Sequence, residues 1–242
     1  MKAVFGTDIG LIREENQDKV AVEYFDNAIL GVVCDGMGGA NNGSEASSIA
    51  IKTFVDNFKN SYRDYLSDDD IKDLLINSME KANTLVYYTS LTDVHKFGMG
   101  TTCVAVLVTK SGKFYTVNVG DSRAYLIADG EYVQITIDHN YAQYLYQLGE
   151  IDKDELETHP DRNMLMRAVG VEDCVRTDFF DYSLEIPFKI LICSDGLHGY
   201  VNIDDIVEIV DNSPLEEVPS KLIGKANACG GRDNVSLIVI ES

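Results

Sequence analysis

The chain has 242 residues, a formal net charge of −20 from 40 acidic and 20 basic residues, and a hydrophobic content of 45%. The charge argues against nucleic acid or an anionic membrane as a partner, because both require a basic face. No apolar run approaches the roughly 20 residues that cross a bilayer. No linker-like segment divides the chain, so we expect one cytoplasmic domain over residues 1–242.

The first half predicts a strand pair followed by two helices. Strands are expected at 20–25 and 29–34, and apolar residues recur at helical spacing after Gly43. Ser67 precedes three aspartates, which suits a helix start because it supplies a cap and places acidic groups at the positive end of the helix dipole. The apolar stripe over 71–86 is predicted to be core.

The centre of the chain predicts hairpins and then a change of pattern. Strands are expected at 101–108, 113–119, 124–127 and 131–135. Residues 138–170 are polar and rich in tyrosine, with short helical pieces expected at 141–148, 152–157 and 164–168. A segment this long is unusual as a plain connection and is a candidate functional insertion.

The last third predicts strands at 175–182, 188–193 and 235–240. Asn202 is expected to cap a helix through Val210, and Ser213 a second one. Pro219 would lie too deep in that second helix and predicts a kink or a new start. The order of elements favours an α+β fold with antiparallel sheets.

The five cysteines are Cys34, Cys103, Cys174, Cys193 and Cys229. Their number is odd and no C-x-x-C pair occurs. We therefore expect buried, reduced thiols instead of disulfides or a zinc site.

Four aspartates lie at the ends of predicted strands. Asp35, Asp121 and Asp195 follow strands, and Asp233 precedes one. Because antiparallel neighbours bring strand ends and starts together, we expect the four at one sheet edge. Clustered carboxylates repel one another unless a cation holds them, and oxygen ligands suit Mg²⁺ or Mn²⁺. Two such ions lower the pKa of a shared water, which provides a nucleophile without Ser, Cys or His.

Residues 11–18 add two further candidates. Arg13 offers a planar set of donors that suits a phosphate dianion. Asp18 begins a strand and is placed to hold metal-bound water. On these residues alone, an ordinary surface arginine and a strand-flanking aspartate are the simpler interpretation. Ser194, beside Asp195, is expected to make a strand-end hydrogen bond and not to act as a nucleophile.

The segments that contain these residues resemble motifs of the bacterial form of the PPM-type metal-dependent serine/threonine protein phosphatases. The matching segments occur in family order over nearly the whole chain: residues 7–18, 35–39, 43–47, 100–102, 119–126, 138–139, 159–170, 193–197 and 230–234. The resemblance implies a sandwich of two antiparallel β-sheets flanked by helix pairs, with 138–170 as a flap beside the site. His139 and His159 fall within these segments, and we expect structural or flap roles for both.

The resemblance also implies two tightly bound Mn²⁺ or Mg²⁺ ions and a third, weaker one. By position, Asp35 would bridge the two ions and the Gly36 carbonyl would bind the second. Asp195 and Asp233 would bind the first. Asp121, together with Asp195, matches the third site.

The implied reaction is hydrolysis of phosphoserine and phosphothreonine in proteins by a metal-bridging hydroxide, without a phosphoenzyme. Asp18 would hydrogen-bond metal-bound water, and Arg13 would bind the phosphate. The expected partners are phosphorylated proteins, among them a serine/threonine kinase of the same cell, with no nucleic acid and no membrane. The chain is expected to act as a monomer.

One residue departs from the family pattern, and two alternative functions therefore stay open. Bacterial members usually carry His after the Asp-Gly-Met-Gly-Gly run, where it is thought to protonate the leaving group, whereas this chain has Ala40. A catalytically impaired regulatory or binding module on the same fold is therefore the second hypothesis. A hydrolase of small phosphate esters is the third, and the flap sequence does not separate it from the first.

Overall fold

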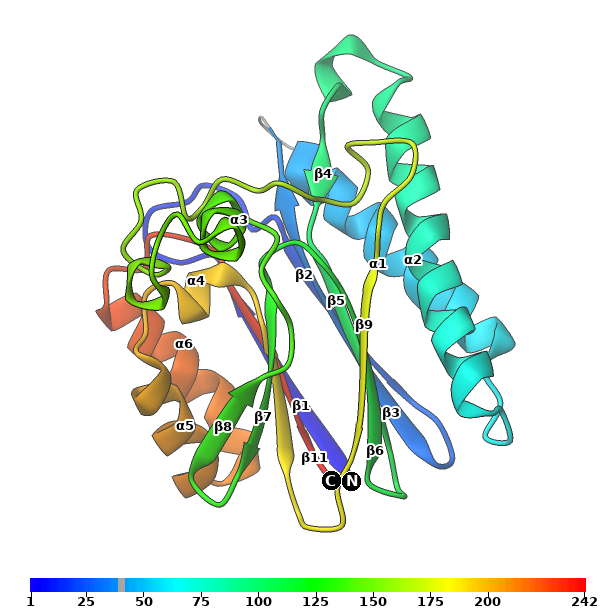
Figure 1. The fold of residues 1–242 in the computed structure, drawn as a ribbon, viewed down its shortest axis with the longest axis vertical. Coiled ribbons are helices and arrows are strands. Elements are labelled where there is room, and N and C mark those ends of the chain that lie inside the picture. Colours follow the sequence, from blue (N-terminus) through cyan, green and yellow to red (C-terminus); the bar gives the residue numbers. More distant parts are fainter. Residues whose placement is uncertain (39–41) are drawn as a thin grey trace.

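The structure, a computed structural model, describes residues 1–38 and 42–242. Two antiparallel sheets face each other, and a pair of helices covers the outer face of each (Figure 1). This confirms the predicted α+β sandwich. Sheet I has the strand order β1-β11-β10-β7-β8, and sheet II the order β2-β3-β5-β6-β9, with β4 paired to β3.

Sheet I consists of β1 (Lys2–Asp8), β11 (Val235–Glu241), β10 (Lys189–Cys193), β7 (Arg123–Ala128) and β8 (Glu131–Gln134). β1 lies at an edge and was not among the predicted strands, because its partly exposed residues carry no apolar run. It pairs with β11 from Lys2 opposite Glu241 onward, so the two chain ends lie side by side (Figure 1). The other four strands of sheet I confirm the sequence predictions to within a few residues.

Sheet II consists of β2 (Asp18–Tyr24), β3 (Ala28–Met37), β5 (Cys103–Thr109), β6 (Lys113–Val119) and β9 (Asp178–Ser183), with β4 (Gly100–Thr101) beside β3. β9 begins later than predicted. Cys34, Cys103 and Cys193 are buried in strands, while Cys174 and Cys229 are exposed, and all five thiols are free. The prediction of reduced thiols is confirmed, and that of burial is wrong for the last two.

Helices α1 (Asn42–Ser61) and α2 (Asp68–Ser90) cover sheet II (Figure 1). The predicted start of α2 is confirmed: Ser67 Oγ accepts the Asp70 N–H, and the Asp70 carboxylate accepts the Ser67 N–H. Such a capping box satisfies two backbone donors at the helix end. The predicted apolar stripe is buried in this layer except for Leu85, which is exposed, and a short 3₁₀ turn, η1 (Val94–Lys96), follows α2.

Helices α5 (Ile203–Asn212) and α6 (Val218–Ala228) cover sheet I, with Asn202 capping α5 as predicted. The helix predicted to start at Ser213 is wrong. Residues after it form a 3₁₀ turn, η3 (Leu215–Glu217), and the Ser213 hydroxyl instead accepts from Lys221. The predicted new start is confirmed, because Pro219 lies in the first turn of α6, where its missing N–H costs no helical bond.

A third apolar layer fills the space between the sheets. Ile29 and Val33 of β3 and Val106 of β5 pack with Ile192 of β10 and Ile238 of β11. All five side chains are at most 2% exposed. At about 25 cal/mol per Å² of apolar area removed from water, this layer contributes a large share of the hydrophobic stabilisation.

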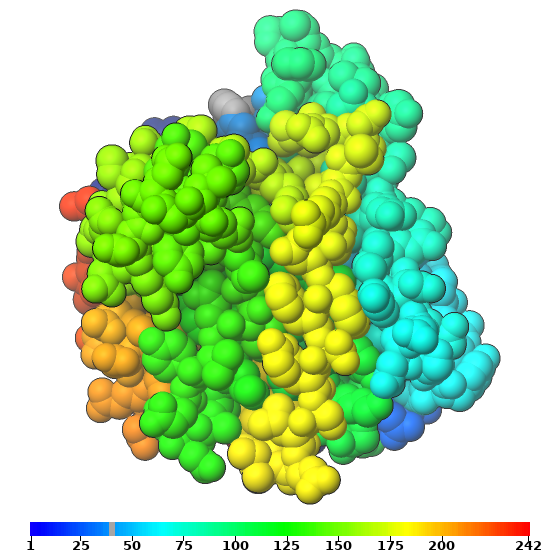
Figure 2. All heavy atoms as spheres, viewed as in Figure 1, coloured from blue at the N-terminus to red at the C-terminus, as the bar shows by residue number. Residues whose placement is uncertain are grey.

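Residues 138–170, which we call the flap segment, form a raised block at one corner of the molecule (green to yellow-green in Figure 2). They contain α3 (Tyr141–Leu148), as predicted, and a 3₁₀ turn, η2 (Lys153–Glu155), within the predicted 152–157. The helix predicted at 164–168 is wrong. That stretch is extended, because its backbone bonds to other segments: Met166 N–H donates to His139, and Val169 pairs with Thr101.

Among the described residues, the longest helices are too polar to span a membrane.

Candidate functional site

The predicted aspartates meet at one end of the sandwich, but not on one sheet. Asp18 begins β2 directly opposite Asp35, which lies inside β3, in sheet II. Asp195 follows β10 at the start of the short helix α4 (Asp195–His198), and Asp233 precedes β11, both in sheet I. Asp121 follows β6. The expectation of a single sheet edge is therefore wrong, since strand periodicity does not reveal which sheet a strand joins.

A direct hydrogen bond joins the site residues of sheet II to those of sheet I. Ser194 Oγ donates to Asp18 Oδ2 at 2.8 Å and accepts the Ser236 N–H at 3.0 Å. Ser194 is fully buried, so its hydroxyl is committed to these two partners. The predicted strand-end hydrogen bond is confirmed, and the Ser194 hydroxyl is buried away from the surface.

The carboxylates share a strongly acidic environment in which Asp18 and Asp121 are buried and Asp35, Asp195 and Asp233 are partly buried. Burial raises the pKa of Asp35 well above its usual value, and the nearby charges of Asp18, Asp195, Asp121 and Asp233 raise it further. Burial likewise raises the pKa of Asp18 and of Asp195 to about 6. Each raised pKa means that the ionised carboxylate is disfavoured until positive charge is supplied. The group as a whole therefore favours a cation.

The donor set fits a divalent cation. Asp18 Oδ1 is buried without a hydrogen-bond partner, although a buried carboxylate oxygen normally has one. At Gly36, an added Cβ would lie 2.1 Å from the Gly43 carbonyl oxygen, so the backbone approaches too closely there for any other residue. Carboxylate and carbonyl oxygens are the ligands that Mg²⁺ and Mn²⁺ prefer.

The carboxylates nevertheless bond to protein partners in this structure. Within residues 1–38 and 42–242, no group of three His, Cys, Asp or Glu side chains is already oriented as a metal-binding set. The hydrogen bonds explain this: Asp233 is ion-paired with Arg13, and Asp18 accepts from Ser194. Of the expected metal ligands, Asp233 would have to give up its ion pair with Arg13 to bind an ion.

Arg13 lies on a loop that is held at several points by one buried side chain. Asn234 Oδ1 accepts the Gln17 N–H at 2.8 Å, and Asn234 Nδ2 donates to the Ile9 and Glu15 carbonyls at 3.0 Å each. The hydrogen bond to Asp233 raises the pKa of Arg13, so the guanidinium stays charged. The sequence analysis missed the role of Asn234, and its place directly after Asp233 was the only available signal.

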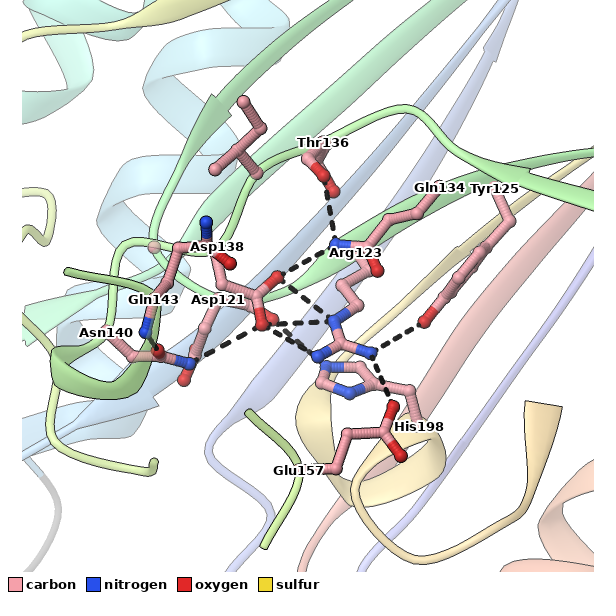
Figure 3. Close-up of polar contacts among 12 residues, drawn as sticks. Asp121, Arg123, Tyr125, Gln134, Thr136, Asp138, Asn140, Gln143, Glu157 and His198 are labelled. Carbon is pink, nitrogen blue, oxygen red and sulfur yellow. Dashed lines mark hydrogen bonds and ion pairs between the residues drawn. The ribbon is translucent and has the colours of Figure 1, made fainter. Parts of the chain in front are cut away.

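The turn that carries Asp121 is surrounded by polar side chains (Figure 3). Arg123 donates to both carboxylate oxygens of Asp138 at 2.8–3.1 Å and to the Tyr125 hydroxyl at 3.0 Å. His198 Nε2 lies 3.0 Å from the Asp121 carbonyl oxygen. Burial, followed by the charge of Asp195, raises the pKa of Asp121 well above its usual value. Asp121 thus belongs to the same acidic group.

Ala40 lies outside the described residues, at 39–41. The impaired-module hypothesis, which depends on Ala40, therefore remains a statement about sequence alone.

Comparisons with known proteins agree with this site. A family model described as protein phosphatase 2C matches residues 13–226. The serine/threonine phosphatase stp of Listeria welshimeri is 36% identical over 243 residues, which cover 100% of this chain and 96% of the relative.

Two solved structures have the same fold. A crystal structure of a bacterial serine phosphatase aligns with a TM-score of 0.90 at 32% identity, covering 100% of this chain and 97% of that one. The catalytic domain of the phosphatase PstP, solved in complex with two manganese ions, aligns with a TM-score of 0.83 at 29% identity, covering 98% and 96%. The chain belongs to the protein phosphatase 2C family of metal-dependent serine/threonine protein phosphatases.

Proposed function

We propose that this chain hydrolyses phosphoserine and phosphothreonine in proteins, using two tightly bound Mn²⁺ or Mg²⁺ ions and a third, weaker one. The observation that carries the proposal is the gathering of buried aspartates from both sheets, which raise one another's pKa beside a charged arginine. Asp35 would bridge the two tight ions, with the Gly36 carbonyl, Asp195 and Asp233 completing the ligand set.

Two further side chains, Arg13 and Asp18, would bind the phosphate and orient a water. Arg13 is half-exposed and, once released from Asp233, presents planar donors that match two phosphate oxygens. Asp18 is fixed by Ser194 through one oxygen, so its other oxygen is available to orient a water. When bound, the ions supply positive charge opposite the phosphate and lower the pKa of a water.

The proposed hydrolysis is direct, with no phosphoenzyme. Support comes from Ser194, the hydroxyl directly before Asp195, because it is fully buried and bonded to the Asp18 carboxylate and the Ser236 N–H. Attack by activated water in line with the leaving oxygen then relies on positioning and electrostatic stabilisation, as is general for phosphoryl transfer.

Several broader features belong to the same proposal and rest on the family resemblance. They are a single domain over 1–242 with the flap segment beside the site, a monomeric state, a cytoplasmic location, and phosphoprotein substrates that include a serine/threonine kinase. The continuous apolar layer between the sheets supports the single domain, since both halves share it.

The test is an Mn²⁺ titration of phosphate release from a phosphothreonine peptide, for the unchanged protein and for Asp35→Asn. Asp26→Asn serves as the matched control, because Asp26 is an exposed turn residue. Metal-dependent release that is lost only in Asp35→Asn supports the proposal. Ion binding without release would favour the impaired module, and release from small phosphate esters alone would favour the third hypothesis.

A further inference from the structure

His139 makes two reciprocal hydrogen bonds with the residue that precedes Asp121. The His139 N–H donates to the Gly120 carbonyl at 3.0 Å, and the Gly120 N–H donates to His139 Nδ1 at 3.0 Å. Gly120 has a φ of +108°, and an added Cβ would lie 2.6 Å from Thr102. The turn is thus held in a conformation that other residues rarely adopt, and His139 contacts it through both backbone and ring.

The ring of His139 is oriented from its other side by β9. Since Nδ1 accepts the Gly120 N–H, we assign the hydrogen of the neutral ring to Nε2, which lies 3.1 Å from Asp178 Oδ2 and 2.9 Å from Arg167 Nη1. Burial, followed by the charge of Arg167, lowers the pKa of His139 and favours this neutral form. Arg167 Nη1 in turn donates to Asp178 Oδ1 at 2.8 Å. The ring therefore connects β9 to the Asp121 turn.

The same residue closes the base of the flap segment. The His139 carbonyl accepts the Met166 N–H at 2.8 Å, and the Tyr141 N–H donates to the Met164 carbonyl at 2.9 Å. Residues 138–140 and 164–166 thus run side by side, and we call them the flap neck. His139 is the one neck residue with hydrogen bonds to the opposite neck strand, to the Asp121 turn and to β9.

Asp138 supplies an independent connection between the neck and the turn. Its carboxylate accepts from Arg123, two residues beyond Asp121, and from Gln134 and Asn140 (Figure 3). The side chains of Arg123 and Asp138 are 15% and 6% exposed, so the pair is largely shielded from water. The neck is therefore attached to both flanks of Asp121.

We infer that His139 is a positioning residue that sets the Asp121 carboxylate through the Gly120 N–H and so couples the third ion to the flap neck. The inference rests on the proposed role of Asp121. It assigns His139 no contact with substrate. Loss of the hydrogen-bond acceptor at His139 Nδ1 should therefore loosen the Asp121 turn and the flap neck together.

Two substitutions separate the two ring nitrogens. In His139→Asn the amide oxygen takes the place of Nδ1 and still accepts from Gly120, while the bond to Asp178 is lost. In His139→Gln the amide nitrogen takes the place of Nε2, and the acceptor for Gly120 is lost. Calorimetric Mn²⁺ titration should show the weak site about tenfold weaker in the Gln variant and within about threefold in the Asn variant.

A second measurement follows the neck without any metal. Amide hydrogen exchange at Met166 should be accelerated in His139→Gln more than in His139→Asn, because only the former removes the side-chain acceptor that joins the turn to the neck. Equal effects of the two variants, or a larger effect of Asn, would overturn the inference. Should neither variant fold, the unchanged protein decides: Mn²⁺ at a concentration that fills the third site must slow amide exchange at both Gly120 and Met166, and unchanged exchange at both would overturn the inference.

The two readouts also separate this inference from the proposed function. If the unchanged protein binds no third ion, the role of Asp121 is wrong, and the exchange ranking at Met166 alone decides whether His139 holds the turn. If the third ion binds but the two variants bind it alike, the role of Asp121 stands and the positioning role of His139 falls.

Discussion

Arg13 Nη2 lies 2.7 Å from Asp233 Oδ2, so the residue proposed to bind phosphate is ion-paired with a residue proposed to bind metal. The two partners come from opposite ends of the chain. If Asp233 binds metal as proposed, it would give up this pair and leave Arg13 free for the phosphate, so metal binding and substrate binding would be linked.

Replacing Arg13 with Gln should therefore weaken catalysis without weakening metal binding. The kcat/KM for a phosphothreonine peptide should fall roughly 10- to 100-fold, because charge-assisted hydrogen bonds to phosphate are lost. The Kd for Mn²⁺ should not rise, because Asp233 loses its competing partner. Steady-state kinetics and calorimetry measure the two, with exposed Arg232→Gln as the control. A weaker Mn²⁺ affinity in the Arg13 variant would contradict this competition.

Asp35→Asn should stabilise the metal-free protein and abolish its response to metal. The substitution removes a buried negative charge that repels four neighbouring carboxylates. Ligand binding to the folded state adds about 2.7 kcal/mol at a free ion concentration of 100 times Kd, and this gain should disappear. Thermal denaturation with Mn²⁺ and with EDTA measures both effects. An unchanged Mn²⁺-induced shift in the variant would remove Asp35 from the ligand set.

The stabilisation by Mn²⁺ should grow with pH. The pKa of Asp18 and Asp195 is raised to about 6 in the folded chain, so their protonation favours folding. That contribution is full below the ordinary value of 3.8 and is lost as pH rises through about 6. Ionised carboxylates then need the cation. The Mn²⁺-induced increase in Tm should be small near pH 5 and large near pH 7, and a flat profile would refute this.

Asn234→Ala should weaken both the fold and the phosphate site. Three hydrogen bonds from its side chain hold the 9–17 loop, and each buried bond contributes about 1 kcal/mol. We expect a loss of about 2–4 kcal/mol in unfolding free energy, together with a higher KM. Denaturant titration and kinetics provide the check, and Asn212→Ala, at the end of α5, is the control. A normal KM would show that the loop does not depend on Asn234.

Ala40→His should increase the rate on a phosphothreonine peptide more than the rate on p-nitrophenyl phosphate. An alkoxide leaves poorly without a proton donor, whereas an aryl oxide leaves without one, and a general acid typically contributes about 10²–10⁴-fold. Parallel assays of the two substrates measure the difference. Equal gains on both would argue against a missing general acid.

The sequence predicted most elements because their signals are local. The buried strands carry apolar runs, and α2 and α5 begin at Ser67 and Asn202, which make the expected caps. β1 escaped prediction because an exposed edge strand needs no apolar run. The extended stretch at 164–168 escaped because Met166 finds its partner in His139, a contact that no local pattern encodes.

The site was predictable as a residue list and not as an arrangement. The strand-end pattern supplied four of the aspartates and the family resemblance supplied their expected roles, and the structure brings them together at one end of the sandwich. The sequence could not predict that Asp35 and Asp195 belong to different sheets, because the pairing of strands depends on the whole chain. Asn234 holds Gln17 across 217 positions, so its role also appears only once the chain is folded.

The apolar layer between the sheets has a consequence for ion affinity. Asp35 moves with β3 and Asp195 with β10, so the spacing of these two oxygen donors depends on how Val33 and Ile192 interlock in the layer below. A volume change there would alter the gap between donors while leaving every donor intact. Apolar contacts far from solvent would thus influence which radius of cation the proposed site accepts.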